Sequence, residues 1–410
     1  MINGYKIECI IMKKRLLFVN HSLKIGGGAN RIAAEIANGL SRRGYDVTFL
    51  KFYDYESEYN VEGEVLSFEE NPQFSYPFEY SIRNLKRGRK IAKICKKRDI
   101  DTVVSFCFAG NYSTTLSRAI FNNDSKTIIS QRNNPLTVNK NKVSMTIKKR
   151  LFPKSDLIIS LSKSVEHLLK SEWGIENTTT IYNPQPLEKF QKMGNKTINL
   201  EHESLFSDEY FVYINVGRLV KQKGQWHLLR VFKKLQKKDK KSRLIILGDG
   251  SLKKRLDRLI KKLGLENKVF FLGVVENVFP YLRKSDCFVF PSLFEGFGNA
   301  QIEALSQNLP VISADCVAGP RDILSPKLEM GDEVNYPYYG EYGILTKPFD
   351  QEMSFESLEK KSLTGEEETL AQAMIEIKED EKLREKYSNG VERVKDFDSD
   401  RIIDQWEKVI

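Results

Sequence analysis

The sequence contains no apolar run of the roughly 20 residues that a membrane-spanning helix needs. In its first 20 residues, short apolar stretches are interrupted by Lys and Arg, and no small-residue cleavage site follows them. We therefore expect neither a transmembrane segment nor a secretory signal. The folded part of the chain is expected to begin near Met12.

Cysteine and histidine are scarce, with five and four residues respectively. The cysteines are odd in number, widely scattered and never arranged as CxxC; they are Cys9, Cys95, Cys107, Cys287 and Cys316. This pattern argues against a disulfide framework and against a cysteine zinc site. We expect reduced thiols and a cytoplasmic protein.

Acidic residues are outnumbered by basic ones, 55 against 65, and the net charge of +10 indicates an anionic partner. Nine basic residues and no acidic one lie between Ser81 and Arg98. Apolar residues recur there at helical spacing, namely Ile82, Leu85, Ile91, Ile94 and Cys95. The segment 81–98 therefore predicts a basic amphipathic helix. Such a helix either contacts an anionic membrane surface or packs its apolar stripe on its own domain.

A chain of 410 residues is expected to form two domains. Strand-like runs alternate with helical patterns, which predicts an α/β fold with parallel sheets. The runs lie at 15–22, 46–53, 101–108, 126–132, 156–162 and 178–184, and, after a polar segment at 188–208, at 209–219, 242–250, 268–275, 286–292, 310–315 and 341–347. We expect one Rossmann-like domain over 12–187 and another over 188–395, with a final helix over 396–410 packing back on the first. Ligands bind at the carboxyl ends of parallel strands, so the site is expected between the domains.

Two strand–helix loops carry features suited to anions. The first, after the strand at 15–22, contains Gly26, Gly27 and Gly28, which allow close backbone approach and leave N–H groups for an anion. It is not a dinucleotide fingerprint, because an arginine stands at the third glycine position. The second loop, GRLVKQKG at 217–224, places Arg218 and Lys223 on a turn where they could bind a diphosphate.

The most specific motif is PSLFEGFGNAQIEAL at 291–305. Glu295 is expected in a loop and Glu303 one turn into a helix, among apolar neighbours. A carboxylate there needs a hydrogen-bonding partner, which vicinal sugar or ribose hydroxyls would supply. Gly296 and Gly298 would leave backbone N–H groups free for phosphate oxygens. The alternative is that these acidic residues simply stabilise a helix N-terminus. That alternative explains Glu295 but not Glu303.

In order, the segments GGGAN, VGRLVKQKG, LIILGDG, PSLFEGFGNAQIEAL and AGPRDIL resemble the large retaining glycosyltransferase family four. The resemblance runs from about Met12 to the end of the chain and is strongest from 210 to 325. The segments SQRNNP, IYNP and AGPRDIL are similar to those of bacterial enzymes that extend lipid-linked surface polysaccharides or glycoprotein glycans. It implies the GT-B architecture, in which two Rossmann-like domains face each other across a deep interdomain cleft.

The resemblance also implies roles for single residues. Arg218 and Lys223 match the pair that neutralises the leaving diphosphate, and Glu295 matches the carboxylate that contacts the donor sugar. Glu303 matches the carboxylate that binds the ribose hydroxyls. Further donor-binding positions implied in this way are Gly27, Gly28, Gly217, Val274, Phe297, Gly298 and Asn299.

One departure concerns the acceptor half. Many members of the family carry a histidine after the fourth strand of the first domain, and this sequence has none there. Either the role passes to Ser105, Asn111 or the Arg132-Asn133-Asn134 segment, or no side chain is needed. His21, beside the glycine loop, is the remaining acceptor-side candidate, and a structural histidine is the alternative.

A metal site is also conceivable at Asp396-Phe397-Asp398-Ser399-Asp400, which has the D-x-D spacing of other transferase folds. The segment precedes a predicted helix instead of following a strand, which favours helix capping by Ser399 or Asp400. Because Arg218 and Lys223 supply positive charge, we expect neither a metal nor a cofactor.

The expected reaction is retaining transfer of a hexosyl or N-acetylhexosaminyl unit from a UDP-sugar to a saccharide, such as a lipid-linked glycan for capsule or O-antigen at the inner face of the cell membrane. Catalysis would come from charge stabilisation and positioning. A UDP-sugar epimerase of the same architecture is one alternative, although it needs catalytic acidic and histidine residues that we cannot place. An NAD(P)-dependent oxidoreductase is disfavoured by the broken glycine fingerprint. A nucleic-acid-binding protein is disfavoured because the basic helix carries aliphatic residues.

Overall fold

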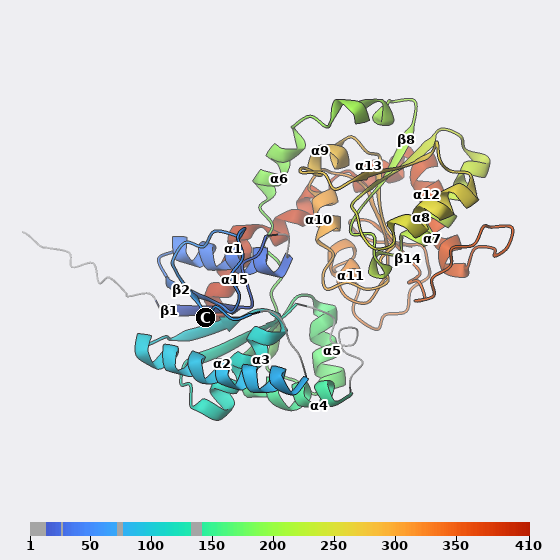
Figure 1. The fold of residues 1–410 in the computed structure, drawn as a ribbon. Helices are drawn as coiled ribbons and strands as arrows, with labels where there is room; N and C mark the ends of the chain where they lie inside the picture. The colour runs from blue at the N-terminus through green and yellow to red at the C-terminus, as the bar shows by residue number, and fades with distance from the viewer. Residues whose placement is uncertain (1–13, 26–27, 72–76, 133–141) are drawn as a thin grey trace, which may run out of the picture.

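The computed structural model describes residues 14–25, 28–71, 77–132 and 142–410. Figure 1 shows two α/β domains joined by crossing segments. Within the described residues, each domain has a seven-stranded sheet, with the orders β3-β2-β1-β4-β5-β6-β7 and β10-β9-β8-β11-β12-β14-β13. The pairings are parallel except that of β13 with β14. The predicted α/β class with two Rossmann-like domains is confirmed.

Except at its edge strands β3 and β7, the first sheet is buried on both faces. Its strands are β1 (Arg15–Asn20), β2 (Asp46–Lys51), β3 (Glu64–Ser67), β4 (Thr102–Ser105), β5 (Lys126–Gln131), β6 (Leu157–Ser160) and β7 (Thr178–Thr180). Its helices are α1 (Gly28–Arg42), α2 (Pro77–Arg98), α3 (Cys107–Phe121), α4 (Lys142–Leu151) and α5 (Lys163–Trp173), with a 3-10 turn η1 (Phe152–Lys154). Successive β1 residues alternate between the faces, so Leu16 packs in the α1 cluster and Leu17 in the α2 cluster.

The second domain repeats this plan. Its strands are β8 (Phe211–Val216), β9 (Ser242–Leu247), β10 (Val269–Gly273), β11 (Cys287–Phe290), β12 (Val311–Ala314), β13 (Tyr338–Tyr339) and β14 (Ile344–Thr346). Its helices are α6 (Leu187–Gly194), α7 (Gln225–Lys238), α8 (Lys253–Leu263), α9 (Phe279–Arg283), α10 (Asn299–Leu305), α11 (Pro320–Leu324), α12 (Gly365–Glu379), α13 (Glu381–Tyr387) and α14 (Val391–Val394), with 3-10 turns η2 (Leu200–Phe206), η3 (Lys221–Lys223) and η4 (Lys395–Phe397).

The sequence indicated a polar linker between the two sheets, but the structure shows that this segment is partly helical and partly buried. It forms α6 and η2, and Leu187 and Phe190 of α6 enter the core of the second domain. The last helix, α15 (Ser399–Val409), lies against α1 in the first domain (Figure 1). Ile403 of α15 approaches so closely that a Cβ on Gly39 would lie 2.7 Å from it.

The predicted basic helix exists as α2, but its apolar stripe was assigned wrongly. Ile91 and Cys95 are buried in the first-domain core, whereas Ile82 and Leu85 are exposed. The buried face also contains Arg87, which pairs with Glu70. Apolar residues of α2 therefore lie on both its buried and its exposed face. One position on the buried face is taken by the Arg87 guanidinium, which can be buried because Glu70 pairs with it. None of the helices formed by the described residues combines the length and apolarity that crossing a bilayer requires.

Candidate active site

The predicted site loops leave both sheets at their topological switch points. In each sheet the chain order reverses between two neighbouring strands, β1 and β4 in the first and β8 and β11 in the second. The loops after these strands diverge and leave a crevice at the carboxyl edge of the sheet. Arg218 follows β8, Glu295 follows β11, and His21 follows β1.

One cavity of about 510 Å³ collects residues from both domains. The second domain contributes Arg218, Gln222, Lys223 and the segment 295–300, and the first contributes His21, Gly28, Ala29, Ile32, Cys107, Phe108, Arg132 and Leu161, with Asn183 of the connecting segment. The structure thus unites most of the predicted site residues. A larger cavity of about 670 Å³, between α6 and the start of α15, contains none of them.

Lys223 and Glu295 form an ion pair at the floor of this cavity. The Lys223 Nζ lies 2.6 Å from Glu295 Oε1, and Gln222 Nε2 donates to Glu295 Oε2 at 3.3 Å. The Glu295 side chain is only 8% exposed, so its charge needs this neutralisation. The short turn η3, which ends at Gly224 in the left-handed region (φ 62°), brings Lys223 to this position.

Arg218 differs from Lys223 in having no acidic partner. Its side chain is exposed to the cavity, and among the described residues no carboxylate oxygen lies within 4.0 Å of it. Gly217, the residue before Arg218, lies beside Lys223: a Cβ there would meet Lys223 side-chain carbons at 3.4 Å, an ordinary van der Waals contact. The second-domain side of the cavity therefore holds one cation neutralised by the protein, Lys223, and one open to a ligand, Arg218.

Glu303 is half-buried on α10, one turn beyond the cavity-lining residues. Burial raises the pKa of Glu303, and the positive charges of Arg31 and Lys223 oppose this rise. Arg31 belongs to α1 in the first domain, so the Glu303 carboxylate feels charges from both sides of the cleft. From the sequence, Arg31 was noted only as the residue that breaks the glycine fingerprint, and its position opposite Glu303 was not predicted.

The three residues before and at the start of α10 hold the site loop in place. Phe297 is buried and stacks on Tyr182, with ring centroids 5.1 Å apart. Gly298 has φ 98° and is the N-cap residue of α10. The Asn299 Oδ1 accepts hydrogen bonds from Asn183 and Gln185 of the connecting segment. Because the Phe297 ring is taken up by packing, only the backbone of this residue can contact a ligand.

On the first-domain side, Gly28 begins α1 and lines the cavity. The N–H groups in the first turn of a helix have no intrahelical partners, so the start of α1 presents donors near the cavity. Gly27 lies outside the described residues. His21 also lines the cavity and is held by Asn20, whose Oδ1 lies 3.3 Å from its Nδ1. Burial, together with the positive charge of Arg87, lowers the pKa of His21.

Four of the predicted residues that the structure describes do not line the cavity: Gly217 and Glu303 lie next to residues that do, whereas Asn111 and Val274 lie elsewhere. Asn111 is buried; it accepts from Ser105 Oγ at 2.9 Å and donates to Ser130 O at 2.8 Å, so its amide ties strands together. Val274 is 80% exposed and lines a separate cavity of about 560 Å³. The reason is topological, because β10 is the edge strand and Val274 follows it, two strands away from β8.

The aspartates of the D-x-D segment are occupied by local contacts. Asp398 caps α15 by accepting from the Asp400 N–H, at 3.3 Å, so the cap lies one or two residues before the positions expected. Asp396 pairs with Arg393 and Arg401. Within the described residues, no cluster of three or more potential ligands suits a metal ion.

Comparison with known proteins agrees with this geometry. Residues 26–189 match the family model for Glycosyltransferase Family 4, and residues 197–360 match that for glycosyl transferases group 1. The chain is 41% identical over 378 residues to an uncharacterized glycosyltransferase of Methanocaldococcus jannaschii, covering 89% of this chain and 92% of that protein. It is 30% identical to N-acetylgalactosamine-N,N'-diacetylbacillosaminyl-diphospho-undecaprenol 4-alpha-N-acetylgalactosaminyltransferase of Campylobacter jejuni, covering 92% and 94%.

Solved structures share the whole fold. Anabaena HepE in complex with UDP superposes with a TM-score of 0.70 at 20% identity, covering 96% of this chain and 99% of that one. Sucrose-phosphate synthase of Thermosynechococcus elongatus gives a TM-score of 0.72 at 18% identity, covering 97% and 98%. The architecture is GT-B, and the chain belongs to glycosyltransferase family 4.

Proposed function

We propose that this glycosyltransferase moves a hexosyl or N-acetylhexosaminyl unit from a UDP-sugar to a lipid-linked glycan, with retention of anomeric configuration and without a metal ion. The observation that carries the proposal is the pair of cations, Arg218 and Lys223, in one interdomain cavity with Glu295. The N-terminal turn of α1 faces the same cavity through Gly28. A nucleoside diphosphate supplies the negative charge that this arrangement lacks.

The Lys223–Glu295 pair suggests how donor binding proceeds. In the unliganded cleft the ammonium neutralises Glu295. When the donor diphosphate enters, Lys223 turns toward a phosphate oxygen, and Glu295 becomes free to accept a hydrogen bond from a hydroxyl of the donor sugar. Glu303, with its pKa raised by burial, accepts from the ribose hydroxyls.

Charge stabilisation drives the chemical step in this proposal. As the bond between the anomeric carbon and the leaving phosphate breaks, Arg218 and Lys223 stabilise the charge that develops on the diphosphate. The acceptor hydroxyl attacks from the same face, and a leaving phosphate oxygen takes its proton. No side-chain nucleophile is assigned, since in the donor complex Glu295 accepts the hydrogen bond from the donor sugar.

The acceptor class is drawn from the relatives. The Campylobacter enzyme is named for a diphospho-undecaprenol acceptor, and a Staphylococcus aureus relative, 30% identical over 260 residues, is named for capsular polysaccharide biosynthesis. The exposed basic face of α2 suits the anionic inner face of the cell membrane, where such lipids would be met. UDP as the nucleotide is supported by the HepE complex.

A donor screen tests the proposal. UDP release is measured from UDP-glucose, UDP-galactose and their N-acetylamino forms, with and without a diphospho-lipid-linked acceptor, and each reaction is repeated with EDTA. We expect acceptor-stimulated release from one or two donors, unchanged by EDTA. GDP- and ADP-sugars are assayed in parallel by release of GDP or ADP, and turnover of these alone would reject the UDP assignment. Loss of turnover with EDTA would reject metal independence.

A further inference from the structure

Four arginine side chains are buried in the described residues, and one of them differs from the others. They are Arg87, Arg132, Arg230 and Arg393. Arg87 pairs with Glu70, Arg230 with Glu367 and Arg393 with Asp396. For Arg132, no carboxylate among the described residues lies within ion-pair distance, and burial without an opposing charge lowers its pKa to about 9.

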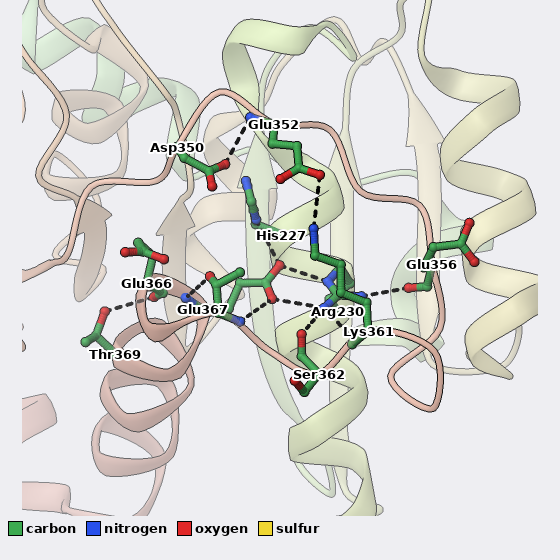
Figure 2. Close-up of polar contacts among 11 residues, drawn as sticks. His227, Arg230, Asp350, Glu352, Glu356, Lys361, Ser362, Glu366, Glu367 and Thr369 are labelled. Carbon is green, nitrogen blue, oxygen red and sulfur yellow. Dashed lines mark hydrogen bonds and ion pairs between the residues drawn. The ribbon is translucent and has the colours of Figure 1, made fainter.

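Arg230 shows what a structural buried arginine looks like in this protein. Figure 2 shows its guanidinium enclosed by Glu367 and by backbone carbonyls of the loop before α12. Every guanidinium nitrogen of Arg230 donates, to Glu367 and to the carbonyls of Glu356, Lys361 and Ser362. Burial of this charge is therefore fully compensated within the protein.

Arg132 is compensated only in part. Its Nη1 donates to Asn183 Oδ1, and its guanidinium carbon lies 4.9 Å from the centroid of the Phe106 ring. Arg132 is only 9% exposed. Its Nε and Nη2 are buried and have no hydrogen-bond partner among the described residues. A desolvated cation with unused donors is costly unless a ligand completes it.

The position of Arg132 points to the ligand. It lines the same cavity as Arg218 and Lys223 but comes from the opposite domain, after β5. Its carbonyl oxygen would lie 2.6 Å from a Cβ on Gly296, so its backbone touches the loop of Glu295. Asn183, which holds the Arg132 guanidinium, also donates to Asn299 at the start of α10. The guanidinium is thus held between the domains, in the wall of the cavity that Arg218 and Lys223 also line.

We propose that Arg132 is an anion-binding residue whose free Nε–Nη2 edge takes two oxygens of a phosphate group in the cleft. A planar guanidinium edge matches phosphate oxygens in a bidentate manner. The inference rests on the proposed function, which brings two such groups to the cleft: the donor diphosphate and the diphosphate of a lipid-linked acceptor. Either source supplies the counter-charge that this side chain lacks.

Calorimetric titration distinguishes the two sources. UDP is titrated into the wild-type protein and into R132M, and inorganic pyrophosphate is then titrated into each protein after saturation with UDP. If Arg132 binds the donor, R132M weakens UDP binding on the order of 10- to 100-fold. If it binds a second phosphate group, UDP binding is unchanged and pyrophosphate binding to the UDP-loaded protein is lost. R132K, which keeps the charge without the flat edge, should fall between the two proteins.

Wild-type-like binding of both ligands by R132M would overturn the inference. A wild-type protein that binds pyrophosphate but not UDP would reject the proposed donor, while the effect of R132M on pyrophosphate would still test Arg132. K221M is the matched control, because Lys221 is exposed on the neighbouring turn and does not line the cavity.

Thermal unfolding separates ligand binding from a structural role. R132M removes a charge that the unliganded protein does not compensate, so its Tm should equal or exceed that of the wild type. R230M removes a fully bonded guanidinium and leaves Glu367 with fewer donors, so its Tm should fall. A comparable fall in Tm for R132M would mean that Arg132 serves the fold, and would overturn the proposal.

Discussion

At the scale of single residues, the cleft is defined by how its charges are neutralised. Glu295 is neutralised by Lys223, whereas Arg218 and Arg132 have no carboxylate partner among the described residues. Unliganded, the cavity is therefore short of negative charge, and an anionic ligand corrects this imbalance. Charge balance explains the site better than any one side chain does.

Removing either donor-side cation should remove most of the activity. We expect R218A and K223A each to lower the rate of UDP release by about 100- to 1000-fold, because charge on the leaving diphosphate is no longer stabilised. K221A is the matched control and should retain wild-type turnover, since Lys221 lies on the same turn but outside the cavity. Circular dichroism should be unchanged in all three variants. Equal activity in K223A and K221A would refute the role of Lys223.

Gly224 should be essential to the geometry of Lys223 for a steric reason. Its φ is 62°, and a Cβ there would lie 2.1 Å from the Pro291 carbonyl oxygen. Gly174 has a similar φ of 63° but nothing within 4 Å of its Cβ position. G174A should therefore cost about 1 kcal/mol of unfolding free energy, while G224A should cost several times more and displace the Lys223 turn. Urea unfolding measures both; equal costs would show that conformation alone matters.

Several of these features could be read from the sequence, and others could not. The resemblance to the family implied that Arg218, Lys223 and Glu295 share one site, and the structure brings them together in one cavity, after strands at a switch point. The resemblance did not predict the position of Val274, which depends on the place of β10 in the sheet order. The sequence also did not predict that Arg132 Nε and Nη2 lack hydrogen-bond partners, because this depends on how both domains pack around the side chain.

At the scale of elements, helices combine packing with surface charge in ways that periodicity only partly predicts. Helix α2 buries Arg87 and Ile91 and exposes Ile82, Leu85 and a series of basic residues. Its existence followed from its pattern, but the assignment of its faces failed, because a paired arginine can occupy the core. Helix α12 was not predicted as a separate element. Thr364 and Glu367 form its capping box, and Glu367 also connects it to His227 of α7.

The exposed face of α2 should bind anionic membranes. Each basic residue near such a surface contributes about 1 kcal/mol, so R89E/K93E should reduce binding to vesicles containing anionic lipid by at least about tenfold. K254E/K261E reverses two exposed charges on α8 of the other domain and should have little effect. Vesicle flotation with and without anionic lipid measures this. Equal losses in both double variants would show that net charge alone is responsible.

The buried cluster around Glu367 should make the second domain sensitive to acid (Figure 2). Burial raises the pKa of Glu367, but hydrogen bonds from His227 and Arg230 outweigh this, and the net pKa lies below its ordinary value of 4.5. Its stabilising contribution is therefore present above pH 4.5 and is lost as the pH falls through the lowered pKa.

E367Q tests this linkage. At pH 7 we expect it to cost about 3–5 kcal/mol of unfolding free energy, because Arg230 keeps a buried charge without its carboxylate. The difference from wild type should shrink below pH 4.5, where the wild-type carboxyl is also being protonated. Urea unfolding at several pH values measures this, and a difference independent of pH would contradict the linkage.

At the scale of the whole molecule, the two domains are connected through the site itself. Asp322 of α11 accepts from the Lys163 N–H at 2.6 Å and from Tyr182 Oη at 3.1 Å. The Asn183 side chain links Arg132 to Asn299 near the same interface. The Asn183 contacts thus join the two domains through residues that line the cleft.

The central claim is that the interdomain cations bind the diphosphate of the donor. Calorimetric titration of UDP and uridine into the wild type, R218A/K223A and K221A tests it most directly. We predict that the wild type and K221A bind UDP far more tightly than uridine, and that R218A/K223A binds the two ligands with nearly equal affinity. Equal affinities in the wild type, or an undiminished preference for UDP in R218A/K223A, would contradict the account.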